Sequence, residues 1–125
     1  MTASQSMAAV VDQPLYLLLY GDQKKVYLER SEHDNKQVLC YLFITIDEAN
    51  EYANFINSQT GSDRIQKVHK LWDIQYLVNW LEPTAADLKD GSLIKLVLVD
   101  KIKEVKARKR PVYKELLTLN KENMN

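Results

Sequence analysis

Hydrophobic and polar positions form short runs along the chain that predict five strands. Residues 15–20 are apolar or aromatic, and residues 25–30 alternate between apolar and polar as a half-buried strand requires. Residues 37–45 are apolar on both faces, which is typical of a central strand covered on both sides. Residues 65–72 alternate weakly, whereas residues 93–99 form a strong apolar strand.

The clearest helix start in the sequence lies directly after the third of these runs. Thr45 and Glu48 have the spacing of a capping box, in which the threonine hydroxyl accepts a hydrogen bond from a free amide of the first turn. Gly61 suits the left-handed position that ends many helices. Between them, five apolar residues fall on one helical face: Ile46, Ala49, Tyr52, Ala53 and Ile56.

Two further helices are expected in the second half of the chain. One begins at Asp73, a favourable N-cap residue, and runs through Glu82 to end before Pro83. A short final helix is expected to start at Pro111, because the missing N–H of proline has no consequence in a first helical turn. The apolar face of that final helix would consist of Val112, Leu116 and Leu119.

The resulting order is three strands, a helix, a strand, a helix, a strand and a helix. This order predicts an α+β fold with a mostly antiparallel sheet of about five strands and with the helices packed on one face. Residues 1–13 are small and polar and are expected to form a flexible leader. Residues 14–100 are expected to form a single α+β domain, and residues 101–125 a basic C-terminal extension with a short helix.

The composition fits one globular domain. The chain has 125 residues, of which 46% are hydrophobic and 27% charged, and these values exclude a fully disordered chain, a collagen-like fibre and a coiled-coil rod. No apolar run approaches the roughly 18 residues of a membrane helix, and the first 13 residues lack the features of a signal peptide. With a single cysteine, Cys40, the chain is expected to be cytoplasmic and not to contact a membrane.

No pattern in the sequence indicates catalysis, a cofactor or a metal. Cys40 lies in an apolar run, where a lone cysteine is usually a small core residue. His33 stands between Glu32 and Asp34, an arrangement more typical of a charged loop than of a metal site. The three glycines do not form a phosphate-binding loop, and the chain lacks a nucleophile elbow. We therefore expect a protein that is not an enzyme.

The helix that begins at Asp73 carries two apolar faces. One is an ordinary core-facing stripe made of Ile74, Leu77, Val78 and Leu81. Trp72, Tyr76 and Trp80 are spaced by four residues and lie about 150° away from that stripe. These aromatic residues predict a protein-binding or self-association face. Two alternatives stay open: the final helix or the leader covers them, or Trp72 belongs to the preceding strand.

Charge is distributed unevenly between the two parts of the chain. The formal net charge is zero, yet residues 101–125 carry +5 and residues 1–100 carry −5. Seven of the eight Lys and Arg side chains of this extension lie within residues 101–114, which we call the basic segment: Lys101, Lys103, Lys106, Arg108, Lys109, Arg110 and Lys114. They are candidates for contact with an acidic partner or with phosphates, and the alternatives are pairing with the acidic body or simple solvation.

These observations favour a non-enzymatic protein-interaction module or adaptor that forms a homodimer through the aromatic helix face, with the basic segment contacting acidic partners. The alternative is a nucleic-acid accessory protein that binds phosphates through residues 101–114. The pI of about 6.7 argues against that alternative, because dedicated nucleic-acid binders usually carry a strongly basic footprint.

Overall fold

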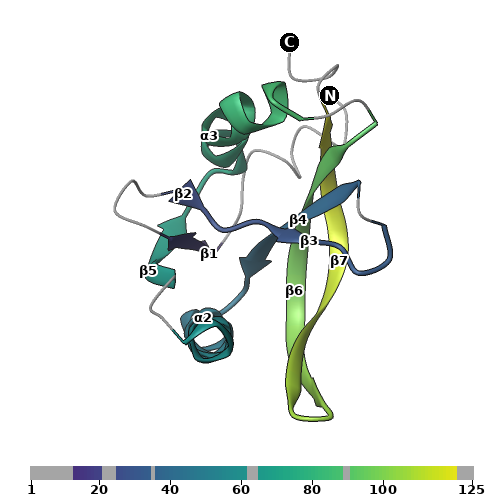
Figure 1. Cartoon of the computed structure of the whole chain (residues 1–125). Helices are drawn as coiled ribbons and strands as arrows, with labels where there is room; N and C mark the ends of the chain where they lie inside the picture. Colours follow the sequence, from purple (N-terminus) through teal and green to yellow (C-terminus); the bar gives the residue numbers. More distant parts are fainter. Residues whose placement is uncertain (1–12, 21–24, 35, 62–64, 89–90, 121–125) are drawn as a thin grey trace.

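The computed structural model describes residues 13–20, 25–34, 36–61, 65–88 and 91–120. It shows an α+β fold with seven strands and two helices in the described residues (Figure 1). The elements are β1 (Leu15–Tyr20), β2 (Lys25–Val26), β3 (Glu29–Arg30), β4 (Gln37–Phe43), α2 (Ile46–Thr60), β5 (Ile65–Leu71), α3 (Ile74–Ala86), β6 (Leu93–Val105) and β7 (Arg108–Asn120). The expected class and the mostly antiparallel sheet are confirmed, although the sheet has seven strands where about five were expected. The leader, residues 1–13, lies outside the described residues except for Gln13.

The sheet is built around β1 and β4. Along one edge, β1 pairs with β5 from Leu15 to Tyr20, while along the other it pairs with β4 only at Tyr16 and Phe43. The short strands fill the space where β1 and β4 diverge, because β2 pairs with β1 and β3 with β4. The single strand expected over residues 25–30 is therefore divided in two, since the segment changes its partner halfway.

The two helices cover opposite faces of the sheet, which corrects the expectation that they pack on one face. In β4, Phe43 and Tyr41 contribute to a core cluster with α2, whereas Cys40 and Leu42 contribute to a second cluster with α3. Figure 1 shows α3 above and α2 below strands β1 and β4. Because β4 is apolar on both faces, each face needs a covering layer. Helix α2 covers one face and α3 covers the other.

The first helix has the ends that its sequence predicts. The Glu48 amide donates a hydrogen bond of 3.2 Å to the Thr45 hydroxyl, which in turn donates to the Glu48 carboxylate. Gly61 has φ of 70° and its amide donates to the Asn57 carbonyl, so the left-handed cap is confirmed.

The second helix begins as expected but ends later. The Asp73 carboxylate accepts a hydrogen bond of 2.9 Å from the Gln75 amide, which confirms the N-cap. The helix then continues through Pro83 to Ala86, where an end before the proline was expected. One further turn is retained because it places Ala85, which is fully buried, against the core beneath α3.

The prediction of a short C-terminal helix starting at Pro111 is wrong. Residues 108–120 form β7, an edge strand antiparallel to β6. The apolar residues of this segment find partners across the strand pair, as Leu119 does opposite Ile94. A proline is tolerated in an edge strand because its missing donor leaves no ladder bond broken. The boundary expected at residue 100 falls within β6, and residues 101–105 and 108–120 are strand residues of the sheet.

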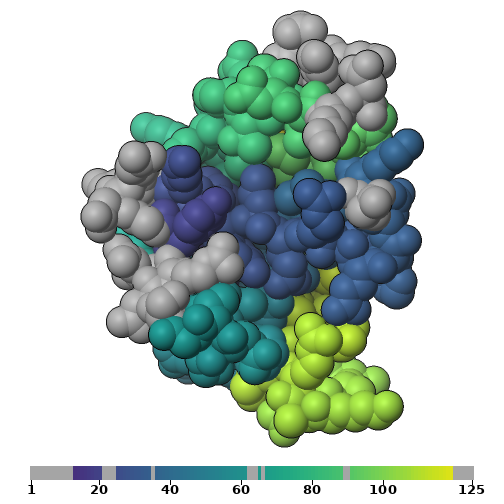
Figure 2. Space-filling view, in the orientation of Figure 1, coloured from purple at the N-terminus to yellow at the C-terminus, as the bar shows by residue number. Residues whose placement is uncertain are grey.

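Strands β6 and β7 extend beyond the rest of the sheet as a long hairpin. Figure 2 shows its far end projecting past α2 at the lower end of the molecule. The two turn residues, Lys106 and Ala107, have φ of 52° and 65°. This pair of left-handed residues is typical of a type I′ turn, for which Asn-Gly is the favoured sequence.

We expect Ala107→Gly to raise the free energy of unfolding by about 0.5–1 kcal/mol, because glycine adopts positive φ without a Cβ clash. Urea unfolding followed by circular dichroism measures the change. The matched control is Ala86→Gly in helix α3, which should lower the free energy of unfolding because the helix there needs no positive φ. A destabilised Ala107→Gly variant would contradict the turn assignment.

Candidate functional site

Trp72, just before α3, and Tyr76 within it are exposed aromatic residues. The exposed fraction is 56% for Trp72 and 74% for Tyr76, while Trp80 is half-buried. The Trp80 ring lies edge-on against His69 of β5, with 5.5 Å between the ring centroids. The Lys70 ammonium lies 5.3 Å from the centre of the Trp72 ring, within cation–π range. Trp80 and Trp72 therefore each contact a side chain of β5.

A groove of about 540 Å³ runs between α3 and the edge of the sheet. We call it the aromatic groove, and its lining residues are Leu19, Lys67, His69, Tyr76, Asn79 and Trp80. Among the described strands, β5 pairs only with β1, so its outer edge next to this groove carries backbone groups without a strand partner. An aromatic surface and an open sheet edge thus lie side by side.

The structure decides two of the alternatives for this surface. A C-terminal helix does not cover it, because that segment is β7 on the opposite edge of the sheet. Trp72 belongs neither to β5, which ends at Leu71, nor to α3, whose N-cap is Asp73. A cover by the leader concerns residues 1–12, which lie outside the described residues.

Part of the basic segment pairs with carboxylates of the same chain. Arg110 lies 2.6 Å and Arg108 3.6 Å from the two carboxylate oxygens of Glu32, in the loop between β3 and β4. Lys109 lies 2.9 Å from Glu51 of α2 and 3.4 Å from Glu104 of β6. The other four basic residues of the segment, all exposed, have no ion pair within the described part of the chain: Lys101, Lys103, Lys106 and Lys114.

Two members of these ion pairs, Glu32 and Lys109, have shifted pKa values. The hydrogen bond from Arg110 and then its charge hold the pKa of Glu32 below its ordinary value. The hydrogen bond to Glu51 holds the pKa of Lys109 above its ordinary value. Both residues therefore stay charged at neutral pH.

A cluster of three tyrosines around Glu29 is the feature that sequence reasoning missed. The hydroxyl groups of Tyr41, Tyr52 and Tyr27 donate to the Glu29 carboxylate over 2.5, 2.7 and 3.0 Å. These side chains come from β4, from α2 and from the segment between β2 and β3. Buried tyrosines need a hydrogen-bond partner, so some partner could be expected from the sequence. Its identity could not, because Glu29 is 12 residues from Tyr41 and 23 residues from Tyr52 along the chain.

Two hydroxyl groups of the tyrosine cluster have raised pKa values. Burial, followed by the nearby charge of Glu29, raises the pKa of Tyr41 and of Tyr52 far above the ordinary value. Both phenols therefore remain protonated at neutral pH and act as hydrogen-bond donors.

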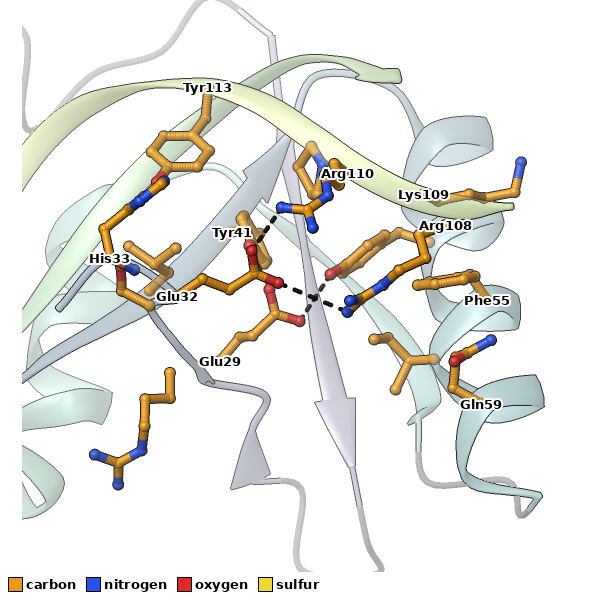
Figure 3. Close-up of a pocket in the computed structure, with 16 residues that line it drawn as sticks. Glu29, Glu32, His33, Tyr41, Phe55, Gln59, Arg108, Lys109, Arg110 and Tyr113 are labelled. Carbon is orange, nitrogen blue, oxygen red and sulfur yellow. Dashed lines mark hydrogen bonds and ion pairs between the residues drawn. The ribbon is translucent and has the colours of Figure 1, made fainter. Parts of the chain in front are cut away.

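A second hollow, of about 390 Å³, opens above this cluster (Figure 3). We call it the cationic cleft, and it is lined by Glu29, Arg30, Ser31, Glu32, His33, Leu39, Tyr41, Tyr52, Phe55, Ile56, Gln59, Arg108, Lys109, Arg110, Pro111 and Tyr113. It lies on the α2 face of the sheet, whereas the aromatic groove lies on the α3 face. The two sites are therefore separate.

Cys40 and His33 are the other residues that the sequence offered as candidates for chemistry. Cys40 is fully buried, and burial raises its thiol pKa to about 12, so the thiol is protonated at neutral pH. His33 is exposed at the rim of the cationic cleft, and its amide donates to the Ser31 hydroxyl. Within the described ranges, no group of three or more His, Cys, Asp or Glu side chains could hold a metal ion. None of the described helices is long and apolar enough to cross a membrane.

Comparison with known proteins adds no assignment. No protein-family model matches this chain, and neither a curated protein nor a solved structure is significantly similar to it. The function has to be argued from the two sites themselves.

Proposed function

We propose that this protein is a non-enzymatic interaction module that forms a homodimer through the aromatic groove and the adjoining edge of β5. The observation that carries this proposal is the position of Tyr76 and Trp72, two large exposed aromatic side chains, beside an open strand edge. Aromatic residues of this kind dominate binding energy at protein interfaces, and an open edge readily adds a strand. The free thiol of Cys40 suits a reducing compartment such as the cytoplasm.

A second copy of the chain is the occupant that the edge favours. Antiparallel pairing of β5 with itself around Val68 places Lys67 opposite His69 of the partner subunit, so the lysines do not face one another. A parallel, in-register pairing would place each lysine against its own copy and is disfavoured by charge repulsion. The zero formal net charge of the chain adds no further repulsion between the copies.

The same pairing would cover the aromatic side chains. Lys67 and His69 lie on the α3 side of β5, since both line the aromatic groove. A two-fold axis perpendicular to the sheet keeps both α3 helices on one side of it, next to the new strand pair. Tyr76 of each copy, which lines the groove, then faces the other copy and is shielded from water.

The test is light scattering on a size-exclusion column with the full chain, which should give twice the 14.5 kDa mass. We expect the double variant Trp72→Ser/Tyr76→Ser to raise the dimer dissociation constant about 30-fold, because interface hot spots contribute about 2 kcal/mol. Both tryptophans of the chain belong to this surface, so their emission should shift to the red as the dimer dissociates on dilution.

Ile46→Ser in α2 is the matched control, since Ile46 is also an exposed apolar residue, with 48% of its surface accessible, but lies away from the groove. It should leave the dimer unchanged. A monomeric wild-type protein at about 100 μM, well above a typical micromolar constant, would contradict the proposal. An unchanged dimer in the double variant would place the interface elsewhere.

Nucleic-acid binding through residues 101–114 is less well supported by the geometry. Arg108, Lys109 and Arg110 pair with carboxylates of their own chain, so a backbone phosphate that makes no other contact has to compete with Glu32 and Glu51. The same pairs reduce the contribution that the basic segment would make to binding an acidic protein partner. The aromatic groove is therefore the main contact surface in this proposal.

A further inference from the structure

We propose that the cationic cleft binds a small aromatic anion, such as an aryl phosphate or aryl carboxylate, and that Glu32 occupies the anion position in the free protein. This proposal is independent of the dimer, because the cleft and the aromatic groove lie on opposite faces of the sheet. A volume of about 390 Å³ lies within the range of small-molecule sites.

The walls of the cleft suit a planar ring. Tyr113 lies edge-on to Tyr41, with 6.0 Å between ring centroids, and Phe55 lies beside Tyr52 at 5.9 Å. These four rings come from β7, β4 and α2, and all of them line the cleft together with aliphatic residues. A planar aromatic ligand would gain both apolar burial and edge or stacked ring contacts there.

The floor of the cleft determines which end of the ligand enters first. The Glu29 carboxylate already accepts three tyrosine hydroxyls, and its negative charge repels an anion at that depth. An amphipathic ligand therefore places its ring against the tyrosines and its anionic group towards the mouth.

The mouth of the cleft holds a carboxylate between two guanidinium groups. Arg110 and Arg108 each approach a different oxygen of Glu32, and Figure 3 shows both arginines directed towards it. A guanidinium group has five N–H donors, of which these contacts use few. The arrangement is the one by which paired arginines bind a carboxylate or phosphate from a ligand.

Glu32 is held only weakly between Arg108 and Arg110. About half of its side-chain surface, 52%, is accessible, as is 48% of that of Arg110 and 59% of that of Arg108. Exposed ion pairs of this type contribute little to stability, so an anion anchored by its ring can replace Glu32 at small cost. Lys109 is held by Glu51 and Glu104 and points away from Glu32, so we assign it no contact with the ligand.

The test is calorimetric titration of the full chain with phenyl phosphate and, separately, with inorganic phosphate. We expect phenyl phosphate to bind at least about tenfold more tightly, because the ring adds more than one kcal/mol of apolar burial. Glu32→Gln should tighten phenyl phosphate binding by about three- to tenfold, since it removes the competing charge. Arg110→Ala should weaken binding about tenfold, and Arg110→Lys should restore only part of it because lysine lacks the planar fork.

Lys101→Ala is the matched control, because Lys101 is an exposed cation of the same hairpin that does not line the cleft. It should change the affinity less than twofold, whereas a general charge effect would weaken binding as much as Arg110→Ala does. Equal affinity for the two phosphates would overturn the aromatic part of the proposal. Absence of phenyl phosphate binding to Glu32→Gln, with the fold confirmed by circular dichroism, would overturn the site as a whole.

Discussion

Replacing Glu29 with alanine is expected to lower the free energy of unfolding by about 3 kcal/mol, because it removes the shared acceptor of three buried hydroxyls. The tyrosines concerned are exposed by only 8% for Tyr27, 5% for Tyr41 and 3% for Tyr52. An unpartnered buried hydroxyl costs about 1–3 kcal/mol, and the lower value applies here because water can enter through the adjoining cleft.

A double-mutant cycle separates this effect from a general loss of packing. In a Tyr41→Phe/Tyr52→Phe background, Glu29→Ala should cost much less, about 1 kcal/mol, because only the hydrogen bond from Tyr27 to Glu29 is then lost. Urea unfolding followed by circular dichroism measures all four proteins. An equal loss in the free energy of unfolding in both backgrounds would show that the Glu29 carboxylate does not stabilise the tyrosine hydroxyls.

Glu115→Ala is the matched control for removing a glutamate. Glu115 forms an ion pair with Lys95 at 2.5 Å, but it is 55% exposed at its side chain. We expect a loss of less than about 1 kcal/mol, the ordinary contribution of an exposed ion pair. The comparison tests whether burial of the partner hydroxyl groups, and not charge itself, determines the effect of Glu29.

The second large effect is expected in the two core clusters on opposite faces of the sheet. Phe43→Ala should lower the free energy of unfolding by about 3–5 kcal/mol and Leu77→Ala by about 2–5 kcal/mol, since both side chains are fully buried. Phe43 belongs to the cluster beneath α2 and Leu77 to the cluster beneath α3, and these clusters share no residue. The two losses should therefore add within about 0.5 kcal/mol.

Thermal and urea unfolding of the two single variants and the double variant test this expectation. If Phe43→Ala does not fold, the milder Phe43→Leu replaces it in the same cycle. A deviation from additivity of more than about 1 kcal/mol would contradict the division of the core into two independent layers. Val78→Ala is the control, because Val78 is only partly buried and should cost less than Leu77→Ala.

The two proposed sites differ in how much of each could be predicted from local sequence patterns. The four-residue spacing of Tyr76 and Trp80 places both on one side of α3 and both line the aromatic groove, whereas Trp72 lies before the helix and contacts Lys70. The cationic cleft could not be predicted in this way. Glu32 contacts Arg110 from a loop 78 positions away, and the two come together because β4 pairs with β6 and β6 pairs with β7.

The sequence by itself determined the features that depend on neighbouring residues: the cap at Thr45, the left-handed end at Gly61, the N-cap at Asp73 and a central strand with two apolar faces. Hydrogen bonds and side-chain alternation within a few residues are enough to specify each of these. Only the tertiary structure decided that residues 108–120 are a strand and that the helices cover opposite faces. A segment with weak local preference takes the conformation that its long-range partner stabilises, and for β7 that partner is the apolar length of β6.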